Sequence, residues 1–391
     1  MRWRILTLLF FARIGLGFQF QTMASVGDDL VVAFGLDYAR IGWLIGLFMA
    51  PGLFLAVPAG FMGRYLSDRL LSVLGLGALA AGGLVSGFAP AEWVIGLGRV
   101  LAGAGFLFAT LYFTKMVADW FEGREIATAM SILVMSWPFG IAMGQVGHTW
   151  LAGAYGWRVP FMVASVYCAI AALGVLLLYR PANDLPAVRG GGSARLSAQE
   201  WQLILCAGAA WGLFNAGYVV YLGFGPKMLE ALGYPVLGAA TVISIGSWLM
   251  IFSGALCGQV ADRFGRRQTI LTVCMTVAVA ALLLLSVPGA GLTASLLFGL
   301  LGMAPAGVIM ALAGQAVPLE KRALGMGIFF TFYYAIMTAV PPMAGSILDA
   351  SASPIGPLIL GAILFAAVVP VALAFRLVQI GSRFRILEEE I

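Results

Sequence analysis

Charge is scarce in this sequence. Asp, Glu, Lys and Arg make up 10% of the 391 residues, and apolar residues make up 62%, against roughly 25% and 45–50% in soluble domains. A soluble chain of this length cannot bury so much apolar surface, so an ordinary globular enzyme is excluded. A disordered chain is excluded too, because disorder requires a polar composition. The sequence therefore predicts a membrane protein with many spans.

Groups that carry catalysis or hold cofactors are also scarce. The chain has one histidine and four cysteines, and the cysteines stand apart in apolar stretches without the spacing of metal ligands. Neither the phosphate-binding G-x-x-x-x-G-K-[ST] pattern nor the G-x-S-x-G nucleophile pattern occurs. We therefore expect no metal, cofactor, ATP drive or enzymatic activity. The net charge of +5 comes from short basic clusters between apolar runs, which does not indicate a nucleic-acid surface.

The apolar residues fall into stretches of about 20 residues, the length of a membrane-spanning helix. Helices are required because open strands would leave backbone groups unpaired in lipid. We expect spans at about 5–26, 41–62, 71–89, 92–114, 128–150, 160–179, 202–224, 237–260, 268–287, 291–313, 324–347 and 357–378. The predicted fold class is an all-α membrane protein with twelve transmembrane helices in two six-helix halves.

One long polar stretch, residues 181–200, separates the two sets of spans. Its prolines and its three consecutive glycines exclude a continuous helix there. We therefore predict an N-terminal half over 1–180, a linker over 181–200, and a C-terminal half over 201–391 with a short tail. Ser197 and Glu200 match a capping box, which predicts a helix leading into Trp201.

Lys and Arg are distributed unevenly between the loops. The loops expected on one side hold most of them, while the other side holds Arg40, Arg158 and Lys227. Cytoplasmic loops are enriched in Lys and Arg. We therefore predict that both termini are cytoplasmic and that these three residues mark the outer side.

The two halves share landmarks. Gly60 and Gly258 each end an expected span before a charged turn, and Arg124 and Arg322 each precede the fifth span of their half. Both pairs have the same sequence separation. This predicts a duplicated six-helix unit, an arrangement known among secondary transporters.

Four segments carry a family resemblance. Residues 258–267, GQVADRFGRR, match G-x-x-x-D-R-x-G-R-R, which resembles the loop motif of the major facilitator superfamily. Residues 98–105 and 156–158 resemble the family's fourth-helix motif and its loop between the fifth and sixth helices, and residues 136–140 are loosely similar to its fifth-helix motif. The resemblance implies a transporter that works as a monomer in the bacterial inner membrane, with the lipid bilayer around it. It also implies that the first, fourth and seventh helices line a central cavity.

The first-half copy of the loop motif departs from this pattern. Arg64 stands where the motif has Asp, and an acid follows at Asp68. In the second half, a tight reversal is expected to need positive φ at Gly258 and Gly265, and Asp262 is expected to accept hydrogen bonds from helix amides or to pair with Arg.

We predict that such charged groups form pairs in one conformation and lose them in another, as a conformational switch. The alternative is that the basic residues only anchor the topology. The predicted switch residues are Gly258, Asp262, Arg263, Gly265, Arg266, Arg267, Asp68, Arg69, Asp119, Glu122, Arg124 and Arg322.

Two arginines lie deep inside expected spans. Arg13 is in the first span and Arg99 in the fourth, whereas every Asp and Glu falls in a loop or at a span end. Ionisable groups inside a membrane are costly and usually functional. A guanidinium group without an acidic partner favours an anion. The alternative is that backbone carbonyl groups satisfy each arginine.

Helical spacing places polar and aromatic residues on the faces that carry these arginines and on the seventh and eleventh spans. The predicted substrate-binding residues are Arg13, Gln21, Arg99, Phe106, Thr110, Trp211, Asn215, Tyr218, Tyr334 and Thr338. The predicted function is transport of a small anion by alternating access, and the loop at 120–125 is similar to that of bacterial carriers of cyanate- or nitrate-like ions. The alternative is export of neutral apolar or aromatic compounds on the same fold.

Overall fold

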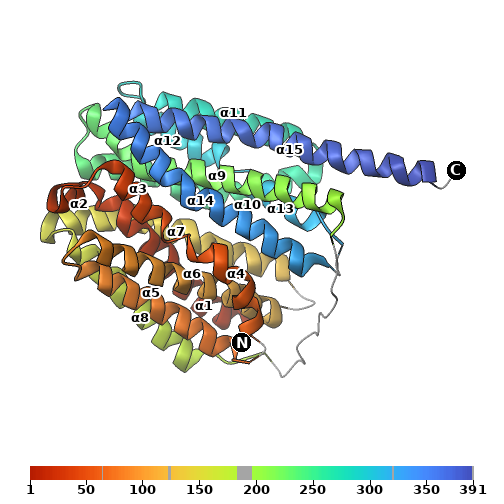
Figure 1. Cartoon of the computed structure of the whole chain (residues 1–391), viewed down its shortest axis with the longest axis horizontal. Coiled ribbons are helices and arrows are strands. Elements are labelled where there is room, and N and C mark those ends of the chain that lie inside the picture. Colours follow the sequence, from red (N-terminus) through yellow and green to blue (C-terminus); the bar gives the residue numbers. More distant parts are fainter. Residues whose placement is uncertain (64, 122–124, 183–195, 319–320, 390–391) are drawn as a thin grey trace.

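The structure is a computed structural model that describes residues 1–63, 65–121, 125–182, 196–318 and 321–389. Within these residues, twelve helical segments are long and apolar enough to cross a membrane. The predicted all-α fold with twelve spans is confirmed. Figure 1 shows the N-terminal elements, coloured red to yellow, on one side of the molecule and the C-terminal elements, coloured green to blue, on the other.

Each half is a bundle of helices. The N-terminal half contains α1 (Arg2–Ser25), α2 (Gly27–Phe34), α3 (Tyr38–Gly46), α4 (Pro51–Met62), α5 (Asp68–Gly87), α6 (Glu92–Trp120), α7 (Ile126–Tyr155) and α8 (Arg158–Leu178). The C-terminal half contains α9 (Ala198–Ala231), α10 (Val236–Phe264), α11 (Arg267–Leu284), α12 (Gly291–Leu297), the π-helix η1 (Phe298–Gly302), α13 (Ala306–Gln315), α14 (Arg322–Ser351) and α15 (Ile355–Glu389).

The second span is broken between α3 and α4. The Phe48 amide donates to the carbonyl of Ile45 at 3.3 Å, so it does not close the i to i−4 bond to Leu44 of a regular α-helix. The Leu44 carbonyl therefore remains available to another donor. This break lies beside the fourth span and, as described below, accommodates a buried charge.

Small residues bring α5 and α6 into close contact. A Cβ atom added to Gly75 would lie 2.8 Å from the Ala109 amide nitrogen, and one added to Gly105 would lie 2.7 Å from the Leu79 amide nitrogen. Only glycine allows backbones to approach so closely, as is common in membrane helix pairs. Gly105 belongs to the 98–105 segment, so that segment shapes helix packing.

The reversal after α10 confirms one sequence prediction and corrects another. Gly265 has φ +65° and donates its amide to the Ala261 carbonyl at 3.0 Å, which ends the helix. The prediction that Gly258 also takes positive φ is wrong, because Gly258 lies inside α10. The helix continues past Gly258, so a single glycine makes the turn.

The start of α9 confirms the predicted capping box. The Glu200 amide donates to Ser197 Oγ at 3.2 Å, and the Ser197 amide donates to Glu200 Oε2 at 2.7 Å. These bonds satisfy amides that a helix leaves unpaired at its first turn. Residues 183–195 of the predicted linker lie outside the described residues.

The halves meet along two pairs of spans: the second span, made of α3 and α4, packs against α14, and α7 packs against α10. In the first pair, an added Cβ atom on Gly42 would collide with the Pro341 backbone, and one on Gly46 would collide with the Thr338 backbone. In the second pair, Phe139 and Trp248 make an edge-to-face contact with centroids 4.9 Å apart.

Candidate functional site

Arg13 projects from α1 onto α7 at a proline. Its Nη1 donates to the carbonyls of Leu133 at 2.8 Å and Val134 at 3.3 Å, and to Ser136 Oγ at 3.2 Å. Pro138 lies inside α7 and has no amide hydrogen, so the Val134 carbonyl lacks its usual helical donor. The proline thus provides an acceptor that holds one end of the guanidinium group.

Close packing of α1 on α7 brings Arg13 to this position. An added Cβ atom on Gly17 would collide with the Trp137 carbonyl, and one on Gly140 would lie 2.8 Å from the Phe18 amide nitrogen. Gly17 is one helical turn beyond Arg13, on the same face of α1. Glycine at these two positions lets the arginine reach backbone acceptors on α7.

The other edge of the Arg13 guanidinium group is left open. All hydrogen bonds of Arg13 to the described residues use Nη1, and its Nε is buried without a partner. The side chain is 8% exposed, and none of the ion pairs among the described residues involves it. Nε and Nη2 form one of the two edges that can bind a carboxylate through parallel hydrogen bonds. The site thus combines a fixed positive charge with an unused donor edge.

Two tyrosines of the opposite half lie near this charge. The Arg13 guanidinium group lies close enough to the phenols of Tyr333 and Tyr334 for electrostatic interaction. Both rings belong to α14 and are buried, with centroids 5.0 Å apart. The structure therefore brings together Arg13 and Tyr334, two of the predicted binding residues, across the boundary between the halves.

Aromatic rings form a continuous cluster in the N-terminal half. Trp137 contacts Phe106 with centroids 5.0 Å apart and Phe20 at 5.4 Å, and Phe48 contacts both phenylalanines at 5.4 Å. Trp137 directly follows Ser136, which contacts Arg13. In the C-terminal half, the half-buried Trp211 lies 6.4 Å from Tyr333. Large apolar rings thus accompany the guanidinium group in both halves.

Arg99 has a different environment. Its Nε donates to the Leu44 carbonyl at 3.1 Å, Nη1 to Gln19 at 3.2 Å and Nη2 to Phe20 at 3.3 Å. The guanidinium group also lies 4.5 Å from the Phe48 ring centroid, and the side chain is 0% exposed. The Leu44 carbonyl is the one that the break in the second span leaves free. In this conformation Arg99 joins α1, α3 and α6, and each of its three nitrogens has a backbone partner.

Other predicted binding residues make contacts within one half. Gln21 donates to Gln145 Oε1 at 2.5 Å, and the Tyr218 hydroxyl lies 2.7 Å from Ser247 Oγ. Thr110 has a buried hydroxyl without a hydrogen-bond partner. These side chains support the two bundles, and the structure does not bring them to Arg13.

Two polar residues bond to the carbonyl one turn earlier in their own helix. Asn215 Nδ2 donates to the Trp211 carbonyl at 2.8 Å, and Thr338 Oγ1 donates to the Tyr334 carbonyl at 2.8 Å. Such bonds tie each side chain to its own helix. Thr338 lies where α14 meets Gly46.

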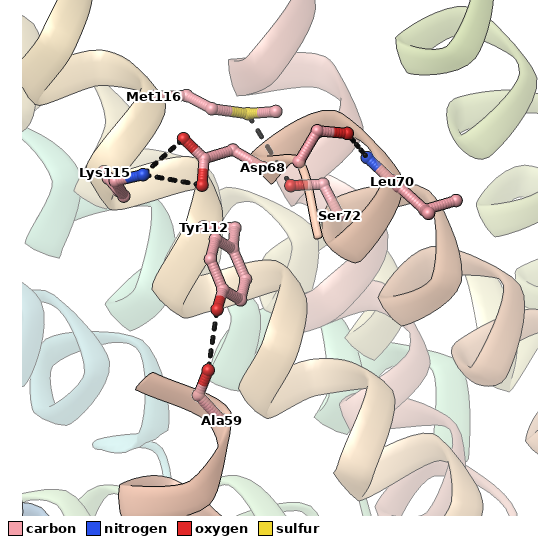
Figure 2. Close-up of polar contacts among 8 residues, drawn as sticks. Ala59, Asp68, Leu70, Ser72, Tyr112, Lys115 and Met116 are labelled. Carbon is pink, nitrogen blue, oxygen red and sulfur yellow. Dashed lines mark hydrogen bonds and ion pairs between the residues drawn. The ribbon is translucent and has the colours of Figure 1, made fainter. Parts of the chain in front are cut away.

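The predicted switch residue Asp68 pairs within its own half. Lys115 Nζ lies 2.7 Å from both Asp68 carboxylate oxygens, as Figure 2 shows. In the same region, Tyr112 donates to the Ala59 carbonyl at 2.6 Å. These contacts join α4, α5 and α6, so a rigid movement of one half against the other leaves them intact.

Two further ion pairs at this end of the molecule also stay within one half. Arg2 pairs with Glu125 at 3.0 Å, and Lys321 pairs with Glu200 at 2.8 Å. Arg263 and Arg266 have exposed side chains. Glu122 and Arg124, together with the side chains of Asp262 and Arg322, lie outside the described residues, while Arg69, Asp119 and Arg267 remain predicted switch residues.

The sequence analysis missed residues that complete the Arg13 site. Ser136 is fully buried and accepts from Arg13, and Tyr333 lies beside Tyr334 on the facing helix. Pro138 gave a signal for the Val134 carbonyl at this site, because a proline inside a span frees a carbonyl one turn earlier. Among the described residues, no group of three or more His, Cys, Asp or Glu side chains is placed to hold a metal ion.

Comparison with known proteins identifies the family. The model of the Major Facilitator Superfamily matches residues 6–341. The chain belongs to this superfamily. It is a multi-pass membrane transporter and not an enzyme.

Curated relatives are similar over most of the chain. A probable 4-methylmuconolactone transporter of Cupriavidus pinatubonensis is 25% identical over 79% of this chain and 75% of the relative. The cis,cis-muconate transport protein of Acinetobacter baylyi is 22% identical over 93% of this chain and 92% of its own. A probable galactarate/D-glucarate transporter of Bacillus subtilis is 23% identical over 90% and 87%.

Solved structures share the fold. A bacterial homolog of the human lysosomal transporter Spinster, in an inward-facing and occupied conformation, has a TM-score of 0.71 at 19% identity and covers 98% of this chain and 97% of its own. A nucleoside transporter has a TM-score of 0.74 at 14% identity, covering 97% and 100%. The superfamily fold is therefore shared over essentially the whole chain.

Proposed function

We propose that this transporter carries a small organic anion by alternating access, and that Arg13 binds a carboxylate group of the cargo. One observation carries the proposal: Arg13 is fixed by Nη1 to α7, while its Nε is buried without a partner. An arginine held this way presents Nε and Nη2 in the geometry that a carboxylate accepts. The functional unit is a single chain, because both halves of one chain contribute to the site.

Electrostatics supports an anion over a cation or a neutral compound. Arginine stays protonated in proteins, and a buried charge without a counter-charge is unstable. The carbonyls of Leu133 and Val134 solvate one nitrogen but supply no negative charge. Cargo that carries the counter-charge is therefore stabilised, and a cation is repelled.

The surrounding side chains favour an anion with an apolar or unsaturated body. The phenols of Tyr333 and Tyr334, in the other half, lie close enough to Arg13 for electrostatic interaction, and hydroxyl groups donate to carboxylates. The rings of Trp137 and Trp211 offer flat apolar surface. Binding groups on both halves allow the cargo to couple their movement.

Two of the relatives are named for transport of acids. Muconate and glucarate are carboxylates, and the proteins named for them cover most of this chain. This agrees with a carboxylate at Arg13 and leaves the individual cargo open to experiment. From the distribution of Lys and Arg we infer that both termini are cytoplasmic, and from the bacterial relatives we infer a bacterial plasma membrane location.

Counterflow in proteoliposomes tests the proposal. A panel of labelled aliphatic and unsaturated carboxylates is compared with neutral aromatic compounds, for the wild type and for Arg13→Gln. We expect carboxylate counterflow to fall on the order of 100-fold in the variant, as for loss of one partner of a buried charge pair. The matched control is Arg158→Gln, because the Arg158 side chain is exposed and stacks on Trp157.

The same experiment separates the alternative function. Export of neutral apolar compounds predicts that Arg13→Gln leaves the transport of neutral aromatics unchanged and that no carboxylate is carried by the wild type. That result would replace the anion proposal. Carboxylate transport that survives Arg13→Gln at the wild-type rate would also contradict it.

A further inference from the structure

At one end of the molecule, a carboxylate of the C-terminal half caps a helix of the N-terminal half. Asp349, in the last turn of α14, accepts the Tyr38 amide on Oδ1 at 3.0 Å and the Ala39 amide on Oδ2 at 2.8 Å. These are the first two residues of α3. The first amides of a helix have no partner within it and carry partial positive charge.

A second polar contact joins the halves at the same end. Lys227 of α9 forms an ion pair with Asp28 of α2. Tyr38 donates its hydroxyl to Asp28 Oδ1 at 2.9 Å, and the Lys227 ammonium lies 4.5 Å from the Tyr38 ring centroid. Tyr38 thus contacts Asp349 through its backbone and the Asp28–Lys227 pair through its side chain.

Close backbone contact makes the cap possible. An added Cβ atom on Gly345 would collide with the Tyr38 carbonyl. Gly345 lies one turn before Asp349 on α14, so the backbones of α14 and α3 are in contact next to the carboxylate. By contrast, the ion pairs shown at the opposite end, such as Asp68–Lys115, each stay within one half.

We propose that Asp349 is a latch that holds the two halves together at the end marked by Tyr38, with Asp28–Lys227 as its second contact. Opening this end separates α14 from α3 and returns two helix amides and a carboxylate to water. The latch therefore favours the conformation closed at this end. Transport requires its release in each cycle, whatever the cargo is.

Distance measurements between the halves test the latch without any substrate. Spin labels are placed at Val32 of α2 and Val236 of α10, which are 86% and 58% exposed, in a background with the four cysteines replaced. Pulsed electron paramagnetic resonance then reports the fraction of molecules with a long, open distance. We expect Asp349→Asn to raise the ratio of open to closed molecules about 5-fold to 10-fold, because the helix amides lose the negatively charged acceptor that bridges the halves.

The matched control removes a carboxylate from the same helix start within one half. Asp37 caps α3 by accepting the Arg40 amide at 2.8 Å, a hydrogen bond that lies within one half. Asp37→Asn should leave the open fraction at the wild-type value. An equal shift in both variants, or no shift in Asp349→Asn, would overturn the latch.

Lys227→Gln provides an independent measurement if Asp349→Asn does not fold. It breaks the second contact and should raise the open ratio by about 2-fold to 5-fold. An unchanged distribution in this variant contradicts the role of the pair. Since the readout needs no cargo, a failed latch and a failed anion site are distinguishable.

Discussion

Arg13 and Arg99 are both buried in the N-terminal half, and they differ in whether a guanidinium nitrogen is left without a hydrogen-bond partner. Arg99 has all three nitrogens bonded to backbone carbonyls and is 0% exposed. Arg13 has one nitrogen bonded and Nε without a partner. A guanidinium group whose nitrogens all have partners needs no other ligand, whereas one with an unpartnered nitrogen can bind an anion. The comparison separates a structural arginine from the proposed binding arginine.

The strongest test of the comparison removes Arg99. Arg99→Met leaves the carbonyls of Leu44, Gln19 and Phe20 buried without this donor, at about 1–3 kcal/mol for each group left unsatisfied. We expect loss of folded protein, measured as yield of monodisperse protein in detergent and as thermal unfolding temperature. Arg13→Met should keep wild-type yield and unfold within a few degrees of the wild type. Equal yields for both variants would remove the distinction.

A smaller loss of stability is expected when a side chain is added beside Arg99. An added Cβ atom on Gly103 would collide with the Phe48 carbonyl in the broken part of the second span. Gly103→Ala should therefore destabilise the protein by about 1–3 kcal/mol, measured by thermal unfolding. Gly77→Ala is the control, because nothing lies within 4 Å of a Cβ atom there. A neutral Gly103→Ala would show that the break can shift freely.

Replacement of each arginine by lysine separates the effect of positive charge from the effect of hydrogen-bond geometry. Lysine keeps the charge but cannot bind a carboxylate with two parallel hydrogen bonds. Arg13→Lys should raise the KM for the transported carboxylate about 10-fold, with little change in the unfolding temperature. Arg99→Lys should instead lower the unfolding temperature, because one ammonium group cannot reach three carbonyls. A rise in KM seen only in Arg99→Lys would show that Arg99, and not Arg13, is the binding arginine.

The smallest effect is expected at Ser136. Its hydroxyl accepts from Arg13 and donates to the Leu133 carbonyl at 2.6 Å. Ser136→Ala removes one of three acceptors of Nη1, so the guanidinium group is held less firmly. We expect a KM increase of about 3-fold in counterflow, with unchanged maximal rate. Ser165→Ala, at another buried serine that bonds within its own helix, should change neither.

Several features of the fold could be predicted because they depend on local sequence. The apolar stretches give the spans, and Ser197 with Glu200 gives the capping box that starts α9. Gly265 gives the turn after α10. The prediction for Gly258 is wrong because a glycine inside a helix-forming stretch does not by itself end the helix.

The candidate site could be predicted only in part. Burial of Arg13 and Arg99 follows from their depth in apolar spans. Their partners do not follow, because the carbonyls that receive them come from helices far along the chain. Tyr333 and Asp349 were missed for the same reason, since each acts on the half to which it does not belong.

The sequence by itself determined that this chain crosses the membrane as twelve helices and belongs to its superfamily. Both features lie in short runs of neighbouring residues: apolar stretches give the spans, and loop motifs give the family. Only the tertiary structure decided which arginine is satisfied. The break after α3 frees a carbonyl for Arg99, and Pro138 frees one for Arg13. Whether a donor meets such a carbonyl depends on how helices pack, and packing joins residues that the sequence keeps apart.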